Sequence, residues 1–201
     1  YKDLNGDGKI DNGGNKYDDM GDMKKIGNNT PRYLFGLDLN ADYKGFDFRA
    51  FFQGVMKRDY WQGSAYFWGA TSLWHSTGFV EHADYFRAEA SNDLPANLNA
   101  YYPRPVFDSS KNRQRQTAYL QNAAYIRLKN VQLGYTLPAN LTHKFYVSKL
   151  RVFVSGENLW TGTSLANMFD PETIGGGDDT DKNGNAYPLS KTISFGISVT
   201  L

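Results

Sequence analysis

The sequence contains no cysteine, and this absence removes several kinds of chemistry at once. Without thiols, these 201 residues hold no disulfide, no thiolate metal site and no cysteine nucleophile. They also lack any run of about 18 apolar residues, which is the length that a transmembrane helix needs. Charge of one sign is not in excess, because the formal net charge is +1, so nothing favours a nucleic-acid partner.

Helical periodicity is scarce as well, and a two-residue alternation of apolar and polar side chains takes its place. In one such stretch, Phe46, Phe48, Ala50 and Phe52 share one face; in the last, Ile193, Phe195 and Ile197 do. The alternation predicts an all-β chain with strands in 31–43, 44–60, 125–138, 149–160 and 191–201. We expect Lys44-Gly45 to form a hairpin turn, and a bulge near Lys129–Asn130, where the phase slips.

The connections between these strands alternate in length. Segments 1–30, 61–120 and 161–190 are long, whereas 43–45 and 138–148 are short. This order is typical of an up-and-down transmembrane barrel, whose long loops lie outside the cell and whose short turns face the periplasm. A soluble β-sandwich with the same alternation is the alternative.

The opening stretch "YKDLNGDGKIDNGG" has the spacing of a calcium loop. Asp3, Asn5, Asp7 and Asp11 offer side-chain oxygens, and Lys9 offers its carbonyl oxygen, around glycines that permit a tight turn. The acid expected at loop position 12 is missing, because Gly14 stands there. The alternative is a solvated turn rich in Asp and Asn, with no metal.

Aromatic residues gather in the segment after the second predicted strand. We expect Tyr60, Trp61, Trp68 and Trp74 to contact a substrate or a partner; the alternative is that they fold this segment on itself. No catalytic constellation stands out, so we do not expect an enzyme. A secreted hydrolase fragment would need paired carboxylates, and no such pair is marked.

Several blocks occur together in one order: "YKDLNGDGKID", "IGNNTPRYLFGLDLNADYKGFDFRAFFQG", "AAYIRLKNVQLGYTLP", "LRVFVSGENLW", "FDPE" and "YPLSKTISFGISVTL". In this order they resemble the C-terminal end of SusC/RagA-like TonB-dependent outer-membrane transporters. The final "SFGISVTL" also resembles the terminal strand signal of outer-membrane barrels, although Leu201 stands where an aromatic residue is usual.

The resemblance implies an importer in the outer membrane of a Gram-negative bacterium, with a barrel of about 22 strands and a plug in its lumen. It also implies a SusD-like surface lipoprotein as partner, TonB as a second partner through a missing N-terminal part, contact with membrane lipid, and glycans or peptides as substrates. Residues 31–201 would then be the last five or six strands with their loops, and 1–30 an extracellular loop. The alternative is a secreted calcium-binding β-sandwich that binds carbohydrate.

The resemblance also implies one more calcium ligand. In the family, an aspartate precedes the "IGN" block by four residues, and Asp22 has this spacing before Ile26. An insertion separates Asp22 from the rest of the loop, so Asp18 and Asp19 are alternative ligands.

Overall fold

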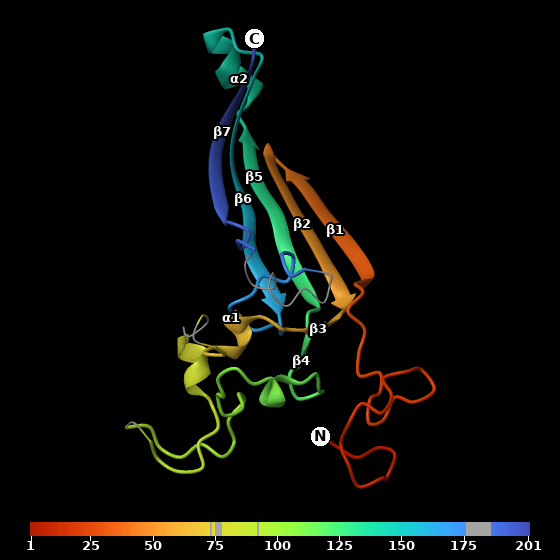
Figure 1. Ribbon diagram of the computed structural model, residues 1–201. Helices are drawn as coiled ribbons and strands as arrows, with labels where there is room; N and C mark the ends of the chain where they lie inside the picture. The colour runs from red at the N-terminus through yellow and green to blue at the C-terminus, as the bar shows by residue number, and fades with distance from the viewer. Residues whose placement is uncertain (73, 75–77, 92, 176–185) are drawn as a thin grey trace. The chain divides into compact units, whose positions relative to one another are not determined.

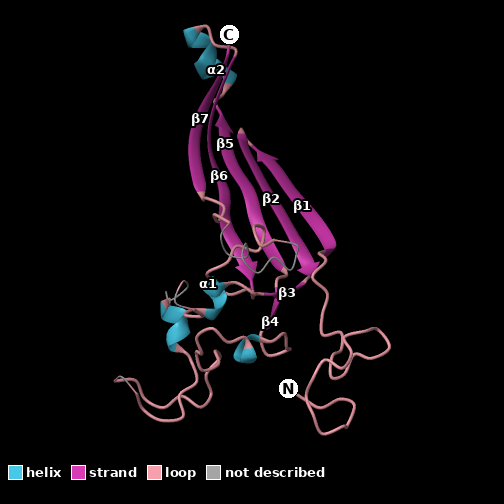
Figure 2. Ribbon diagram, in the orientation of Figure 1, coloured by secondary structure: helices cyan, strands magenta, loops and turns pink. Residues whose placement is uncertain are grey.

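The computed structural model describes residues 1–72, 74, 78–91, 93–175 and 186–201 (Figure 1). Two compact units are present. One consists of Tyr1–Asn29 and Tyr60–Leu120, and the other of Thr30–Asp59 and Gln121–Leu201. The second unit carries the long strands, whereas the first is mainly loops with short helical turns (Figure 2).

The second unit is built on a five-stranded sheet in which every neighbouring pair is antiparallel. Its strand order is β1-β2-β5-β6-β7, so each long strand lies beside the next long strand of the chain. The alternating stretches of the sequence therefore form strands as predicted, within a few residues. The bounds are β1 Arg32–Tyr43, β2 Phe46–Lys57, β5 Tyr125–Thr136, β6 Lys149–Thr163 and β7 Thr192–Thr200.

Both short connections lie at the same end of this sheet (Figure 1). Lys44 and Gly45 have φ angles of 47° and 88°, as a two-residue hairpin turn of the primed type requires. Between β5 and β6 the chain forms α2 (Ala139–Thr142) and the 3-10 turn η3 (His143–Phe145). The predicted hairpin and the predicted short connection are thus confirmed.

The predicted bulge is present in β5. Phe51 and Phe52 of β2 are consecutive, yet they pair with Asn130 and Leu128, so Lys129 is the extra residue. The pairing of β5 with its other neighbour, β6, shifts register at the same level. Leu128 pairs with Trp160, whereas Asn130 pairs with Glu157. The bulge lets the strand keep its apolar residues on one face despite the slip of phase in the sequence.

Two short strands were not predicted, since three residues carry too little alternation to be recognised. They are β3 (Asp59–Trp61) and β4 (Leu120–Asn122), which form a separate two-stranded sheet. The other helical turns are α1 (Ala65–Trp68), η1 (Val80–Ala83) and η2 (Lys111–Arg113). Within the described part of the chain, no helix is long and apolar enough to cross a membrane.

Candidate functional site

One face of the five-stranded sheet is apolar and open. Residues that pair directly across antiparallel strands point to the same face, so the register defines rows of side chains. Phe195 is 84% exposed, and Phe46, Phe48 and Leu133 are also exposed. Two rows of this face are Ala41, Phe48, Leu133, Val154, Phe195 and Tyr43, Phe46, Tyr135, Val152, Ile197.

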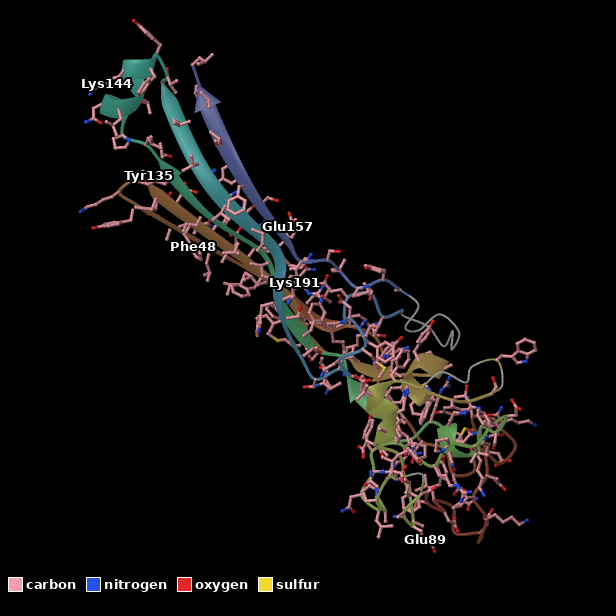
Figure 3. All side chains as sticks on the ribbon, turned by 90° about the vertical axis from the view of Figure 1, so that its left-hand side faces the viewer. Phe48, Glu89, Tyr135, Lys144, Glu157 and Lys191 are labelled. Atoms are coloured by element: carbon pink, nitrogen blue, oxygen red, sulfur yellow. The ribbon has the colours of Figure 1, made fainter. Side chains whose placement is uncertain are left out.

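The other face is polar at the same levels. One of its rows runs from Asn40 through Arg49, Gln132 and Ser155 to Ser194. The different side chains of the two faces are visible in Figure 3, where Phe48 and Tyr135 lie on one side of the sheet and Glu157 on the other. A sheet with one continuous apolar face and one mainly polar face, on which Phe51 and Phe153 are apolar exceptions, is typical of strands between a lipid medium and a polar interior.

A second sheet that could bury the apolar face is missing from the described residues, whose only other sheet is the small pair β3-β4. The sandwich alternative is therefore not supported. Aromatic rings stand near both ends of the apolar face: Phe46 and Tyr135 lie 4.6 Å apart beside the short connections, and Trp160 lies toward the opposite end. Rings at these levels are typical of the interfacial girdles of membrane strands.

Two ion pairs cross the polar face. Arg49 donates to both oxygens of Asp38, at 3.1 and 2.6 Å, between β2 and β1. Arg151 of β6 reaches over β5 to Asp47 of β2, with an Nε–Oδ2 distance of 2.8 Å and a second bond from Nη2 to Oδ1. This second pair closes directly over Gly134, and a Cβ atom there would collide with both of its members.

The opening loop is folded by its own carboxylates. Asp3 accepts hydrogen bonds from the backbone N–H groups of Gly6 and Gly8, at 2.6 and 2.9 Å. Asp7 accepts one from the N–H of Lys9 at 2.8 Å. Gly6 and Gly8 have φ angles of 79° and 82°, which side-chain-bearing residues rarely adopt, so the glycines of the motif are required by the turn.

Asp22 joins this loop from beyond the insertion. Its carboxylate accepts hydrogen bonds from the N–H groups of Leu4 and Asp11, at 2.6 and 2.9 Å. These two backbone hydrogen bonds lower the pKa of Asp22 below its ordinary value, and the bond from Leu4 has the larger effect. Asp19 instead accepts from Gly14, at 2.7 Å, and closes the insertion.

The predicted ligands Asp3, Asn5, Asp7, Lys9, Asp11 and Asp22 thus belong to one folded loop. Their four aspartates do not form a preassembled site, since the described residues contain no cluster of three or more acidic, histidine or cysteine side chains placed to hold one metal ion. The calcium site stays a prediction.

The aromatic residues of the first unit pack mainly against each other. Tyr60 and Trp68 are buried, and Trp68 donates its indole N–H to the carbonyl of Gln62 at 3.0 Å. Trp61 lies 5.7 Å from Trp68, ring to ring, whereas Trp74 is 93% exposed. Of the four residues predicted to contact a substrate or a partner, Trp74 is the most accessible, and that contact stays a prediction.

Comparison with known proteins gives consistent relatives, although no family model matches the chain. It is 29% identical over 206 residues to TonB-dependent receptor P3 of Formosa agariphila, and 28% identical over 213 residues to receptor P26 of the same organism. These alignments cover 99% and 100% of this chain but only 18% and 19% of the receptors.

Among solved structures, the chain is similar to the RagAB peptide importer. In the closed-closed state of that importer the TM-score is 0.63 at 25% identity, covering 88% of this chain and 18% of the other. In the open-open state the TM-score is 0.61, also at 25% identity, covering 86% and 17%. The chain therefore corresponds to about a fifth of the length of its relatives.

The two-faced sheet, the strand order and these similarities agree on one assignment. The sheet is not closed, as expected for one segment of a larger barrel. Its apolar face is the lipid-facing side, and the polar face is the side that a barrel turns to its lumen. The chain is a homologue of one segment of the SusC/RagA-like TonB-dependent receptors of the Gram-negative outer membrane.

Proposed function

We propose that this chain is part of a TonB-dependent importer that takes up glycans or peptides together with a SusD-like surface lipoprotein. One observation carries the proposal: the five-stranded sheet has a lipid-type face and a polar face, and it is similar in fold and sequence to a segment of the RagAB peptide importer.

The experiment follows uptake by the complete protein in a Gram-negative outer membrane. Labelled peptides and labelled oligosaccharides are offered to cells with TonB and to cells without it. The proposal predicts that one of the two substrate classes enters only when TonB is present. Uptake that is equal in both strains, for both classes, would contradict it.

Its lipoprotein partner is tested separately. The complete protein is extracted in a mild detergent through an affinity tag, and co-purifying lipoproteins are identified by mass spectrometry after surface labelling of the intact cells. We expect a SusD-like lipoprotein at equal stoichiometry. Recovery of the transporter alone, at full uptake activity, would contradict the partnership.

We further propose that the opening loop binds one structural Ca²⁺ ion. The loop carries four aspartates among the six predicted ligands, and Ca²⁺ prefers six to eight oxygen ligands of this kind. Each carboxylate oxygen has two lone pairs, so an oxygen that accepts one backbone N–H still has a site for a cation. Asp22 supports the proposal, because its hydrogen bonds from Leu4 and Asp11 hold it beside the loop.

A further inference from the structure

A cluster of largely buried charges connects β5 with the loop after β6, and it has no part in the features described so far. Arg127 of β5 donates to Asp170 at 2.7 Å and lies 3.2 Å from Glu172, while Lys129 reaches Glu172 at 2.8 Å. The side chains of Arg127 and Asp170 are only 4% and 8% exposed. Two cations and two anions balance here, in a site where an unpaired charge is strongly unfavourable.

Asp170 is the centre of this cluster. One carboxylate oxygen accepts from Arg127 and from the N–H of Glu172, and the other accepts from the N–H of Leu189 at 3.1 Å. The carbonyl of Asp170 also receives the N–H groups of Thr173 and Ile174. The same residue therefore folds its own segment and ties that segment to β5.

Apolar packing accompanies these charges. Within residues 164–175, which we name the strap, the side chains of Leu165, Phe169 and Ile174 are all buried. A bond of 3.1 Å from Arg58 to the carbonyl of Gly175 attaches the far end of the strap. A segment with buried apolar side chains and a buried ion network at several points along its length is a fixed element rather than a free loop.

The register puts the strap on the polar face of the sheet. Arg127 pairs with Gln53 of β2 and Thr161 of β6, which belong to that face. The bulge matters here, because the extra residue Lys129 reaches Glu172 while Leu128 still pairs with Phe52 on the apolar side. The strap is therefore on the opposite side of the sheet from the lipid.

We propose that Arg127 and Lys129 are positioning residues that hold the strap as a permanent part of the lumen wall, where it limits the size of the molecules that pass. This inference rests on the proposed import function, since it assigns the strap a place along the same pathway. The strap limits size rather than charge, because the four charges of the cluster cancel each other.

The first part of the test asks whether the strap is fixed. In the complete protein, Leu165→Cys gives a buried reporter in the strap, and Trp74→Cys gives an exposed one; labelling with a water-soluble maleimide is timed in intact cells. Leu165→Cys should react more slowly by about tenfold or more, since a buried site reacts only through local opening. Equal rates at the two positions would overturn the proposal, and this comparison needs no change in the ion cluster.

The second part asks whether the cluster holds the strap in the pathway. Arg127→Met should raise the labelling rate of Leu165→Cys by about tenfold, because opening then no longer breaks the ion pairs. It should also raise the uptake of long substrates relative to short ones. Arg127→Lys keeps a positive charge, so its rises in labelling rate and in long-substrate uptake should be smaller than those of Arg127→Met. Arg49→Met, which breaks another ion pair of the same face, should produce neither rise.

A rise in labelling with an unchanged ratio of long to short uptake would overturn the role in size selection. Failure of the import proposal looks different, because uptake would then be independent of TonB in the parent protein, whereas the labelling difference between Leu165→Cys and Trp74→Cys would still report on the strap.

Discussion

The Asp47 carboxylate and the Arg151 guanidinium meet over Gly134 of β5, the strand that lies between their own strands β2 and β6. The pair spans β2, β5 and β6, and the side-chain amide of Gln132 accepts a further bond from Arg151 at 3.1 Å. A two-point contact between a guanidinium and a carboxylate is directional, so it fixes how the three strands sit relative to one another on the polar face.

Gly134→Ala is therefore expected to destabilise the sheet. Its methyl group would force the ion pair apart, and overpacking of this kind costs about 1–3 kcal/mol. Gly36→Ala is the matched control on β1, where the nearest atom, in the ring of Phe51, is 3.3 Å from the added Cβ. Urea unfolding of the complete protein in lipid vesicles measures both, and equal midpoints for the two variants would contradict the role of Gly134.

Phe195→Arg tests the lipid-facing side. An arginine at the bilayer midplane of a membrane strand costs about 2–4 kcal/mol, so this variant should unfold at a lower urea concentration than the parent. Ser194→Arg is the control, because its side chain lies on the polar face next to Ser155. If Ser194→Arg destabilised the protein as much as Phe195→Arg, the assignment of the two faces would be wrong.

Asp7→Ala tests the calcium proposal. Removal of this carboxylate should abolish the bound ion and make residues 1–25 sensitive to protease, while the strands from Arg32 onward stay resistant. Asp18→Ala is the control, since Asp22 and Asp19, and not Asp18, accept the backbone N–H groups of Asp11 and Gly14. Metal analysis of the purified complete protein should find one Ca²⁺ in the parent and in Asp18→Ala; a parent without Ca²⁺ would disprove the site.

The strap should be released only in strong acid. Burial by itself raises the pKa of Asp170, but the hydrogen bonds from Arg127 and from two backbone N–H groups outweigh it and lower the pKa below the ordinary 3.8. The carboxylate thus stabilises the strap fully above 3.8, and this stabilisation is lost as the pH falls through the lowered value.

A spin label on Asn167→Cys, an exposed strap position, measures this release as a gain in mobility. Mobility should be constant from neutral pH down to about pH 4 and should rise below it. The same label in Asp170→Asn should be mobile at every pH. A transition well above pH 4 in the parent would contradict the lowered pKa.

The long strands were predictable because each of them has about ten or more residues in a period-two pattern, as in β2 and β7. The hairpin at Lys44-Gly45 and the bulge at Lys129 were predictable for a related reason, since a tight turn and a slip of phase both leave a local mark in the sequence. These features depend on residues that are close together in the chain.

The strap and its ion cluster were not predicted. Arg127 and Asp170 are separated by 43 positions, and the strap between β6 and β7 has no regular period. The block "FDPE" contributes to the family resemblance, but its sequence does not indicate which strand Asp170 contacts. The sequence leaves the choice among Asp18, Asp19 and Asp22 open for the same reason, because it depends on how the insertion folds back; in the structure, Asp22 is the residue that reaches Leu4.

One measurement tests the central claim most directly, and it uses β7, whose side chains alternate without interruption from Ile193 to Val199. Single cysteines at these positions of the complete protein carry a fluorescent probe, and quenching is compared between a lipid-confined and a water-soluble quencher. We predict that the lipid-confined quencher acts at Ile193, Phe195, Ile197 and Val199, and the water-soluble one at Ser194, Gly196 and Ser198. Quenching without this two-residue alternation, or with the two sets exchanged, would contradict the account.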